Sequence, residues 1–269
     1  MMVTQSEGAR MELASFSERV LLNSERLTDF EEEFSKYVMA NPEEASAQTV
    51  TSLAQRFYVA PNSIVRFARK LGYTGFSDMR FSLGKEMELR QLAERQRTSK
   101  ELPSTLELVN RTFELCCKPK VEKRAAKMLA EADRVAFFAV GETAYAAHTF
   151  ARLFEEFDNK TQFITYENQM RREIARGDGL VVVLVSLSGE TAQILGAASV
   201  AKDAGVPIIS VTDLHPCSLT RYATLSLYCC SPQKHLDGIN VTDLTPLFAA
   251  LTSLENAYYR EIGVLPPEE

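Results

Sequence analysis

Five short apolar runs in the second half of the chain constrain its fold more than any other feature. Each run is nearly continuous in apolar residues, and helix-length segments such as residues 143–157 and 192–204 lie between them. Strands of this kind, alternating with helices, form a parallel sheet that is buried on both faces. The sequence therefore predicts an α/β domain of three layers, α/β/α, with a five-stranded parallel sheet. The expected strands are residues 134–140, 161–166, 180–186, 207–212 and 224–229.

The first 85 residues have helical periodicity instead, which predicts an all-α helix-turn-helix bundle. One apolar stripe runs from Leu27 to Val38 and is broken at Asn41-Pro42. Two further stripes, in residues 50–57 and 64–71, are separated by only a short turn. Proline suits the first turn of a helix and glycine the position just past its end. Pro61 is therefore expected in the first turn of one helix and Gly72 just past the end of that helix. Ser77 is expected to cap the start of a further helix.

These periods divide the chain into three parts. Residues 1–85 are the predicted helix-turn-helix bundle, the polar stretch 86–104 is the predicted linker, and residues 105–269 are the predicted α/β domain. An amphipathic stretch at residues 242–262 predicts a long C-terminal helix that packs on the sheet or on a second subunit.

Composition excludes several classes of protein. The chain has 269 residues, 45% of them apolar and 25% charged, as in ordinary globular proteins. No apolar run is long enough to cross a membrane, and the N-terminus lacks the apolar core of a signal peptide. The five cysteines are an odd number and show no zinc-binding spacing. We therefore expect a cytoplasmic protein with reduced thiols, no membrane contact, no bound metal and no cofactor.

The net charge of −6 conceals a basic segment. Residues 54–85 contain six basic side chains and one acidic one. Affinity for phosphate groups depends on local charge, so the chain total does not exclude nucleic acid.

The helix predicted from Pro61 separates apolar from polar side chains. Ile64, Phe67, Ala68 and Leu71 share one face, and the opposite face is polar and basic. In a helix-turn-helix, a short first helix leads through a tight turn into a recognition helix, which presents a polar and basic face to the major groove. The helix predicted from Pro61 has this arrangement. The alternative is the solvated face of a helical dimerisation domain. The predicted DNA-binding residues are Asn62, Ser63, Arg66, Arg69 and Lys70.

A cluster of small polar residues, LVSLSGETAQ, follows the apolar run GLVVVLV. The cluster lies between the end of a predicted strand and the start of a predicted helix. Backbone amides at such a helix N-terminus can bind an anion, and the helix dipole also favours a negative charge there. It lacks the lysine of a Walker loop and the first glycine of a nucleophile elbow. Simple helix capping would also account for an isolated loop of this kind.

Two further loops at the same predicted sheet edge favour a binding site. VGET follows the first strand and VTDLHPCSL follows the fourth, and both supply hydroxyl groups. Three such loops at one edge predict a pocket for a polyhydroxy anion. The candidate ligand-binding residues are Gly141, Thr143, Ser186, Ser188, Gly189, Thr191 and Ser218.

The motifs SLSGET, AKDAG and TDLHPCSL resemble those of SIS (sugar isomerase) domains, which bind phosphosugars. The string SIVRFARKLGYTGFSDMR resembles the helix-turn-helix of RpiR-type transcription regulators. The resemblance implies that Ser186, Ser188 and Thr191 hold the phosphate, with Thr143 and Ser218 completing the sugar-phosphate site.

This chain departs from the family pattern at three places. The turn has Tyr58-Val59-Ala60 where such regulators commonly have Gly-Val-Ser. The first loop of the SIS half reads AVGET instead of Gly-x-Gly-x-Ser, and the Ser-Arg pair often seen before the last helix is absent from GINVTDLT. These changes bear on which sugar is bound.

The resemblance and the residues together predict a non-enzymatic transcription regulator of carbohydrate metabolism. Its expected partners are a double-stranded DNA operator with an inverted repeat, a phosphosugar effector, and further copies of itself as a homodimer or a dimer of dimers. One alternative is a sugar-phosphate isomerase with a helical extension, and another is a structural dimerisation module. The candidate bases for an isomerase are His148, His215, His235, Glu142 and Glu167.

Overall fold

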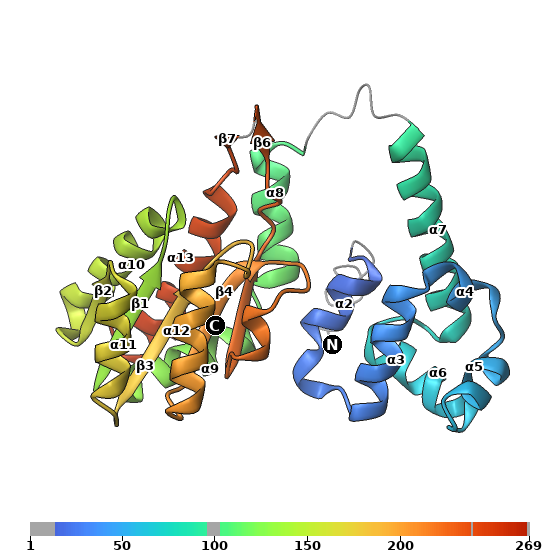
Figure 1. Cartoon of the computed structure of the whole chain (residues 1–269), viewed down its shortest axis with the longest axis horizontal. Helices are drawn as coiled ribbons and strands as arrows, with labels where there is room; N and C mark the ends of the chain where they lie inside the picture. Colours follow the sequence, from blue (N-terminus) through green and yellow to red (C-terminus); the bar gives the residue numbers. More distant parts are fainter. Residues whose placement is uncertain (1–13, 96–102, 238, 268–269) are drawn as a thin grey trace. The chain divides into compact units, whose positions relative to one another are not determined.

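The structure, a computed structural model, describes residues 14–95, 103–237 and 239–267 (Figure 1). The chain divides into two compact units, Met1–Leu102 and Pro103–Glu269. The predicted linker begins inside helix α7, which runs from Phe76 to Arg95, and its residues 96–102 lie outside the described part.

All regular elements in the described part of the N-terminal unit are helices, as predicted. Pro42 occupies the first turn of α4, which confirms the break after α3. The core holds Phe34, Leu53, Ile64 and Phe67, all fully buried. The elements before α7 are α2 (Phe16–Leu22), η1 (Ser24–Arg26), α3 (Asp29–Ala40), α4 (Pro42–Ala47), α5 (Val50–Arg56) and α6 (Pro61–Lys70).

One predicted cap in this unit is wrong. The sequence predicts that Ser77 caps the helix after α6, but α7 begins at Phe76, so Ser77 lies inside its first turn. The Asp78 carboxylate instead accepts hydrogen bonds from the Thr74 amide at 2.7 Å and the Thr74 hydroxyl at 3.1 Å. An acidic side chain inside the first turn therefore ties down the entry to α7.

The C-terminal unit contains the predicted five-stranded parallel sheet, in the order β2-β1-β3-β4-β5. Its central strand β3 is buried along its whole length, as expected for a sheet covered on both faces. The strands are β1 (Arg134–Ala139), β2 (Thr161–Ile164), β3 (Leu180–Val185), β4 (Ile208–Asp213) and β5 (Leu225–Cys229).

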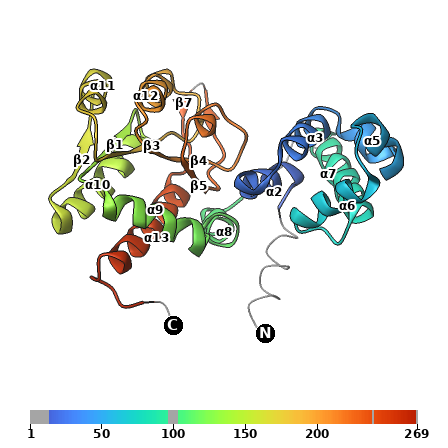
Figure 2. The ribbon, with the colours of Figure 1, turned by 90° about the horizontal axis from the view of Figure 1, so that it is seen from below.

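Helices cover the two faces of the sheet and form the outer layers (Figure 2). Alternate strand residues contribute to two separate apolar clusters, because successive side chains point to opposite faces. One face carries α9 (Pro119–Glu131), α10 (Thr143–Asp158) and α13 (Thr245–Glu261). The other face carries α11 (Glu167–Ala175) and α12 (Ala192–Asp203). The predicted C-terminal helix, α13, thus packs on its own sheet.

Several short elements complete the unit. They are α8 (Thr105–Arg111), a π-helical turn η2 (Thr112–Cys116), a 3-10 turn η3 (Leu219–Arg221) and a hairpin of β6 (His235–Leu236) and β7 (Ile239–Asn240). All five cysteines are free thiols, and four of them are buried. No helix in the described part of the chain is both long and apolar enough to cross a bilayer.

Candidate functional site

The carboxyl edge of the sheet contains a topological switch point. The chain passes from β1 outward to β2, then returns to place β3 on the other side of β1. The pairing of Ala139 with Val185 brings the loops after β1 and β3 to the same edge. Parallel α/β sheets bind their ligands at such a point, outside the ends of the strands.

The loop after β3 (residues 186–191) has interconnected hydroxyl groups. The hydroxyl oxygen of Ser186 lies 2.9 Å from that of Thr191 and 3.4 Å from that of Ser188. Ser186 also accepts a hydrogen bond from the Gly189 amide at 3.2 Å, and Ser188 accepts one from the Glu190 amide at 3.2 Å. The structure therefore brings together the four predicted residues of this loop.

Two amides of the loop are available to a ligand. The backbone N–H groups of Ser188 and Thr191 have no hydrogen-bond partner among the described residues. Thr191 is also the residue before α12, and its side chain does not cap that helix. Two free amides beside a helix N-terminus and several hydroxyl groups are suited to an anion.

The loop after β4 (residues 214–219) is bonded directly to the loop after β3. The Ser218 amide donates to the Glu190 carboxylate at 2.6 Å, and the Leu219 amide donates to the Gly189 carbonyl at 3.1 Å. The bond from the Ser218 amide lowers the pKa of Glu190. Ser218 therefore reaches the predicted site, with its amide held by Glu190.

Gly141 lies in the loop after β1, and Thr143 is the first residue of α10. Gly141 has a positive φ of 72°, so glycine is favoured there. The Thr143 hydroxyl donates to the Val140 carbonyl of that loop at 3.1 Å. Strand register places both residues at the same sheet edge as residues 186–191, but no hydrogen bond joins the two loops in the described structure.

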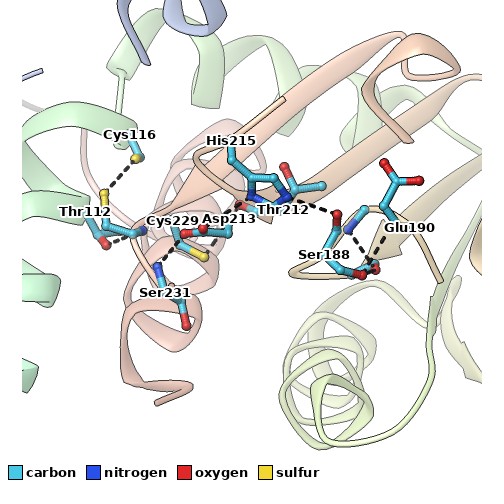
Figure 3. Close-up of polar contacts among 12 residues, drawn as sticks. Thr112, Cys116, Ser188, Glu190, Thr212, Asp213, His215, Cys229 and Ser231 are labelled. Atoms are coloured by element: carbon cyan, nitrogen blue, oxygen red, sulfur yellow. Dashed lines mark hydrogen bonds and ion pairs between the residues drawn. The ribbon is translucent and has the colours of Figure 1, made fainter. Parts of the chain in front are cut away.

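His215 links the loops after β3 and β4 (Figure 3). Its Nε2 lies 3.1 Å from the Ser188 carbonyl oxygen, and its Nδ1 lies 3.3 Å from the Asp213 carboxylate. Both partners are acceptors, so only the protonated ring donates to both. The hydrogen bond to Asp213 therefore raises the pKa of His215, and the Ser188 carbonyl and the charge of Glu190 add to this. Burial opposes the shift.

This pair makes the stability of the C-terminal unit depend on pH. The pKa of His215 is higher in the folded state than in the unfolded state. The stabilisation that His215 provides is therefore complete below the unfolded-state pKa of 6.5 and is lost as pH rises through the folded-state pKa. We expect His215→Gln to cost more unfolding free energy at about pH 5.5 than at about pH 8.5. Urea unfolding of both proteins at both pH values measures the difference. His235→Gln, at an exposed histidine, is the control; an equal cost for His215→Gln at both pH values would contradict this.

From the sequence, His215 was predicted only as a possible base, and Asp213 and Glu190 were not predicted to belong to the site. The spacing in TDLH, an acid two residues before a histidine at a strand end, is the signal that could have found the pair. The Glu190–Ser218 contact had no such signal, because it joins loops that are 28 residues apart.

The predicted DNA-binding residues lie on α6. Asn62, Arg66 and Arg69 are exposed, and Ser63 is half-buried. Arg69 donates to the Thr74 carbonyl at 3.3 Å, and Arg66 has no hydrogen bond or ion pair within the described residues. The apolar side of α6 is buried in the core, as predicted.

Lys70 is placed differently from the other four residues. Its ammonium group forms an ion pair with the buried Glu31 carboxylate and donates to the Arg26 carbonyl at 3.0 Å. Burial favours a raised pKa for Glu31, but hydrogen bonds from Lys70 and Thr28 outweigh it and lower the pKa. Lys70 therefore ties α6 to the start of α3.

No cluster of three or more histidine, cysteine or acidic residues in the described structure could hold a metal ion.

Comparison with known proteins assigns both units. The helix-turn-helix domain of the rpiR family matches residues 16–89, and the SIS domain matches residues 128–254. The HTH-type transcriptional regulator GlvR of Bacillus subtilis (strain 168) is 24% identical over 251 residues, covering 88% of this chain and 92% of GlvR. Glutamine–fructose-6-phosphate aminotransferase (isomerizing) of Thermococcus kodakarensis is 29% identical over 111 residues, covering 40% of this chain and 18% of the enzyme.

A solved structure has the same fold. The Vibrio vulnificus NanR protein complexed with ManNAc-6P superimposes with a TM-score of 0.53 at 21% identity, covering 93% of this chain and 92% of that chain. The matched segments span most of both units and agree with the folds described above. This chain therefore belongs to the rpiR family of helix-turn-helix transcription regulators, with a SIS domain as its C-terminal unit.

Proposed function

We propose that this regulator senses a phosphosugar at the carboxyl edge of its sheet and controls genes of carbohydrate metabolism. The observation that carries the proposal is the loop 186–191, whose free Ser188 and Thr191 amides lie at the topological switch point. These amides and the hydroxyls around them would hold the phosphate, with Gly189 allowing the tight turn. Gly141, Thr143 and Ser218 would line the sugar side.

The relatives support the class of ligand. NanR is complexed with ManNAc-6P, and the aminotransferase that matches 111 residues of this chain is named for fructose 6-phosphate. Both names refer to 6-phosphates of a hexose or a hexose derivative. The test is a thermal-shift panel with ManNAc-6P, fructose 6-phosphate and inorganic phosphate.

Ser188→Ala is expected to weaken binding of the best phosphosugar by about 1–3 kcal/mol, because a donor to a charged group is lost. Titration calorimetry measures the change. The control is Thr149→Ala, which removes an exposed hydroxyl bonded only within α10. DNA affinity without ligand should be unchanged. Unchanged phosphosugar affinity in Ser188→Ala would place the phosphate elsewhere.

We further propose that α6 is the recognition helix, with Asn62, Ser63, Arg66 and Arg69 facing DNA. The exposure of Asn62, Arg66 and Arg69 and the local positive charge support this. Lys70 has a structural role in this proposal, because its ammonium group is committed to α3. One helix contacts few bases, so two copies would act on an inverted repeat as a homodimer or a dimer of dimers.

The proposal includes no catalysis. An isomerase needs a base that can take a proton from the sugar, and both ring nitrogens of His215 are engaged with Asp213 and Ser188. Glu142 is exposed at the start of α10 and remains the alternative base. Interconversion of fructose 6-phosphate and glucose 6-phosphate by the purified protein, lost in Glu142→Gln, would favour the enzyme instead.

A further inference from the structure

The turn between α5 and α6 contains an unusual tyrosine. Tyr58 has a φ of 54°, in the left-handed region of backbone conformation that residues with a Cβ rarely adopt. It is also 96% exposed, so burial in the core does not account for its ring.

The backbone of this turn follows a common pattern for ending a helix. The Tyr58 amide donates to the Gln55 carbonyl at 3.2 Å, and the Val59 amide donates to the Ala54 carbonyl at 2.9 Å. This pair of bonds is the Schellman motif, whose left-handed position is usually glycine. The fold therefore explains the left-handed backbone but not the tyrosine.

The same unit provides an internal comparison. After α6, the Gly72 amide donates to Arg69 at 3.0 Å and the Tyr73 amide donates to Ala68 at 3.1 Å, with a Gly72 φ of 84°. The same motif thus ends two successive helices, once with glycine and once with Tyr58. The strain accepted at Tyr58 is of the kind that concentrates at functional sites.

The surroundings of Tyr58 suit a polyanion. The residue lies three positions before Pro61, which opens α6, and α6 presents Arg66 and Arg69 to solvent. The only acidic residue in the segment 54–85, Asp78, is engaged with Thr74. The Tyr58 side chain makes no hydrogen bond or ring contact within the described residues, so its hydroxyl group is available as a donor.

We propose that Tyr58 is a DNA-backbone contact of this protein, with its hydroxyl group donating to a phosphate oxygen beside the groove that α6 enters. The contact rests on the proposed assignment of α6. It is independent of base sequence, because it is made to the phosphate. The phenol hydroxyl donates a hydrogen bond without bringing a cationic group to the phosphate.

The test separates DNA binding from folding. In Tyr58→Gly, the full-length protein should unfold about 4 °C higher, because glycine adopts this backbone without strain. The same variant should bind a labelled random-sequence duplex of about 30 base pairs at least tenfold more weakly. A residue with only a structural role cannot produce these opposite changes.

Two further variants sharpen the result. Tyr58→Phe keeps the ring and should weaken binding about tenfold without changing the salt dependence, because no charge is lost. Tyr166→Phe removes an exposed tyrosine hydroxyl in the other unit and should bind like the parent. Parent-like binding by Tyr58→Phe or Tyr58→Gly would overturn the proposal, as would a lower unfolding temperature in Tyr58→Gly.

Arg66→Ala, measured on the same duplex, distinguishes this proposal from the assignment of α6. If Arg66→Ala binds like the parent while both Tyr58 variants bind weakly, Tyr58 still contacts the DNA backbone, but the recognition-helix assignment, and with it the place of Tyr58 beside the groove of α6, is wrong. Unchanged DNA binding with lost self-association in the Tyr58 variants would assign the ring to a protein interface and overturn the proposal.

Discussion

Replacing Gly189 with alanine is expected to destabilise the C-terminal unit by about 2–5 kcal/mol and to abolish phosphosugar binding. Gly189 has a φ of 61°, which costs a residue with a Cβ about 1–2 kcal/mol. A Cβ built there would also lie 2.3 Å from the Cys217 sulfur and 2.6 Å from the Cys217 Cβ. Relieving such overlap typically costs about 1–3 kcal/mol more. The loops after β3 and β4 would have to separate, and this would displace the Ser188 and Thr191 amides.

The chain offers a matched control for this substitution. Gly205 has a similar φ of 70°, but a Cβ there meets no heavy atom within 4 Å. Gly205→Ala should therefore cost only the backbone strain, about 1–2 kcal/mol, and should leave phosphosugar binding intact. Urea unfolding and calorimetry of both variants measure the two effects. Equal costs for the two variants would show that the loops can move apart freely.

Replacing Lys70 with methionine is expected to destabilise the N-terminal unit by about 2–3 kcal/mol. The substitution keeps most of the apolar stem and removes the ammonium group, leaving the Glu31 carboxylate buried without its counter-ion. Breaking a fully buried ion pair costs about 3–5 kcal/mol. The cost is expected to be smaller here, because about a quarter of the Lys70 side chain is exposed to solvent. By contrast, Arg66→Ala should leave stability nearly unchanged and reduce DNA affinity.

Two measurements test the role of Lys70. Glu31→Gln with Lys70→Met should recover part of the lost stability, because no charge is then left unpaired. The parent should also lose stability as pH falls through the lowered pKa of Glu31, since this contribution is complete only above the usual value of 4.5. Lys70→Met should show less of this loss. A stable Lys70→Met protein with weak DNA binding would return Lys70 to the DNA-facing set.

The repeating apolar patterns were enough to predict the main elements. Most predicted elements lie within a few residues of their predicted positions. They are the five strands, the helices α3, α5 and α6 of the N-terminal unit, and the helices α10, α12 and α13 of the C-terminal unit. Burial of one helix face leaves a period of about 3.6 residues, and burial of both faces of a strand leaves a short continuous apolar run. The elements that were not predicted include α2, α9 and α11, and the β6–β7 hairpin, whose two-residue strands are too short to show a pattern.

The two-part architecture, the rpiR-type pairing of domains and the position of loop 186–191 at the end of a buried strand could all be predicted from the sequence alone. These features depend on local periodicity and on contiguous motifs. The folded structure was needed to show that Lys70 pairs with Glu31, that Glu190 holds Ser218 and that His215 joins Asp213 to Ser188. Charged and polar side chains on a surface can reach several partners, and which partner they bind depends on distances between elements that are far apart in the chain.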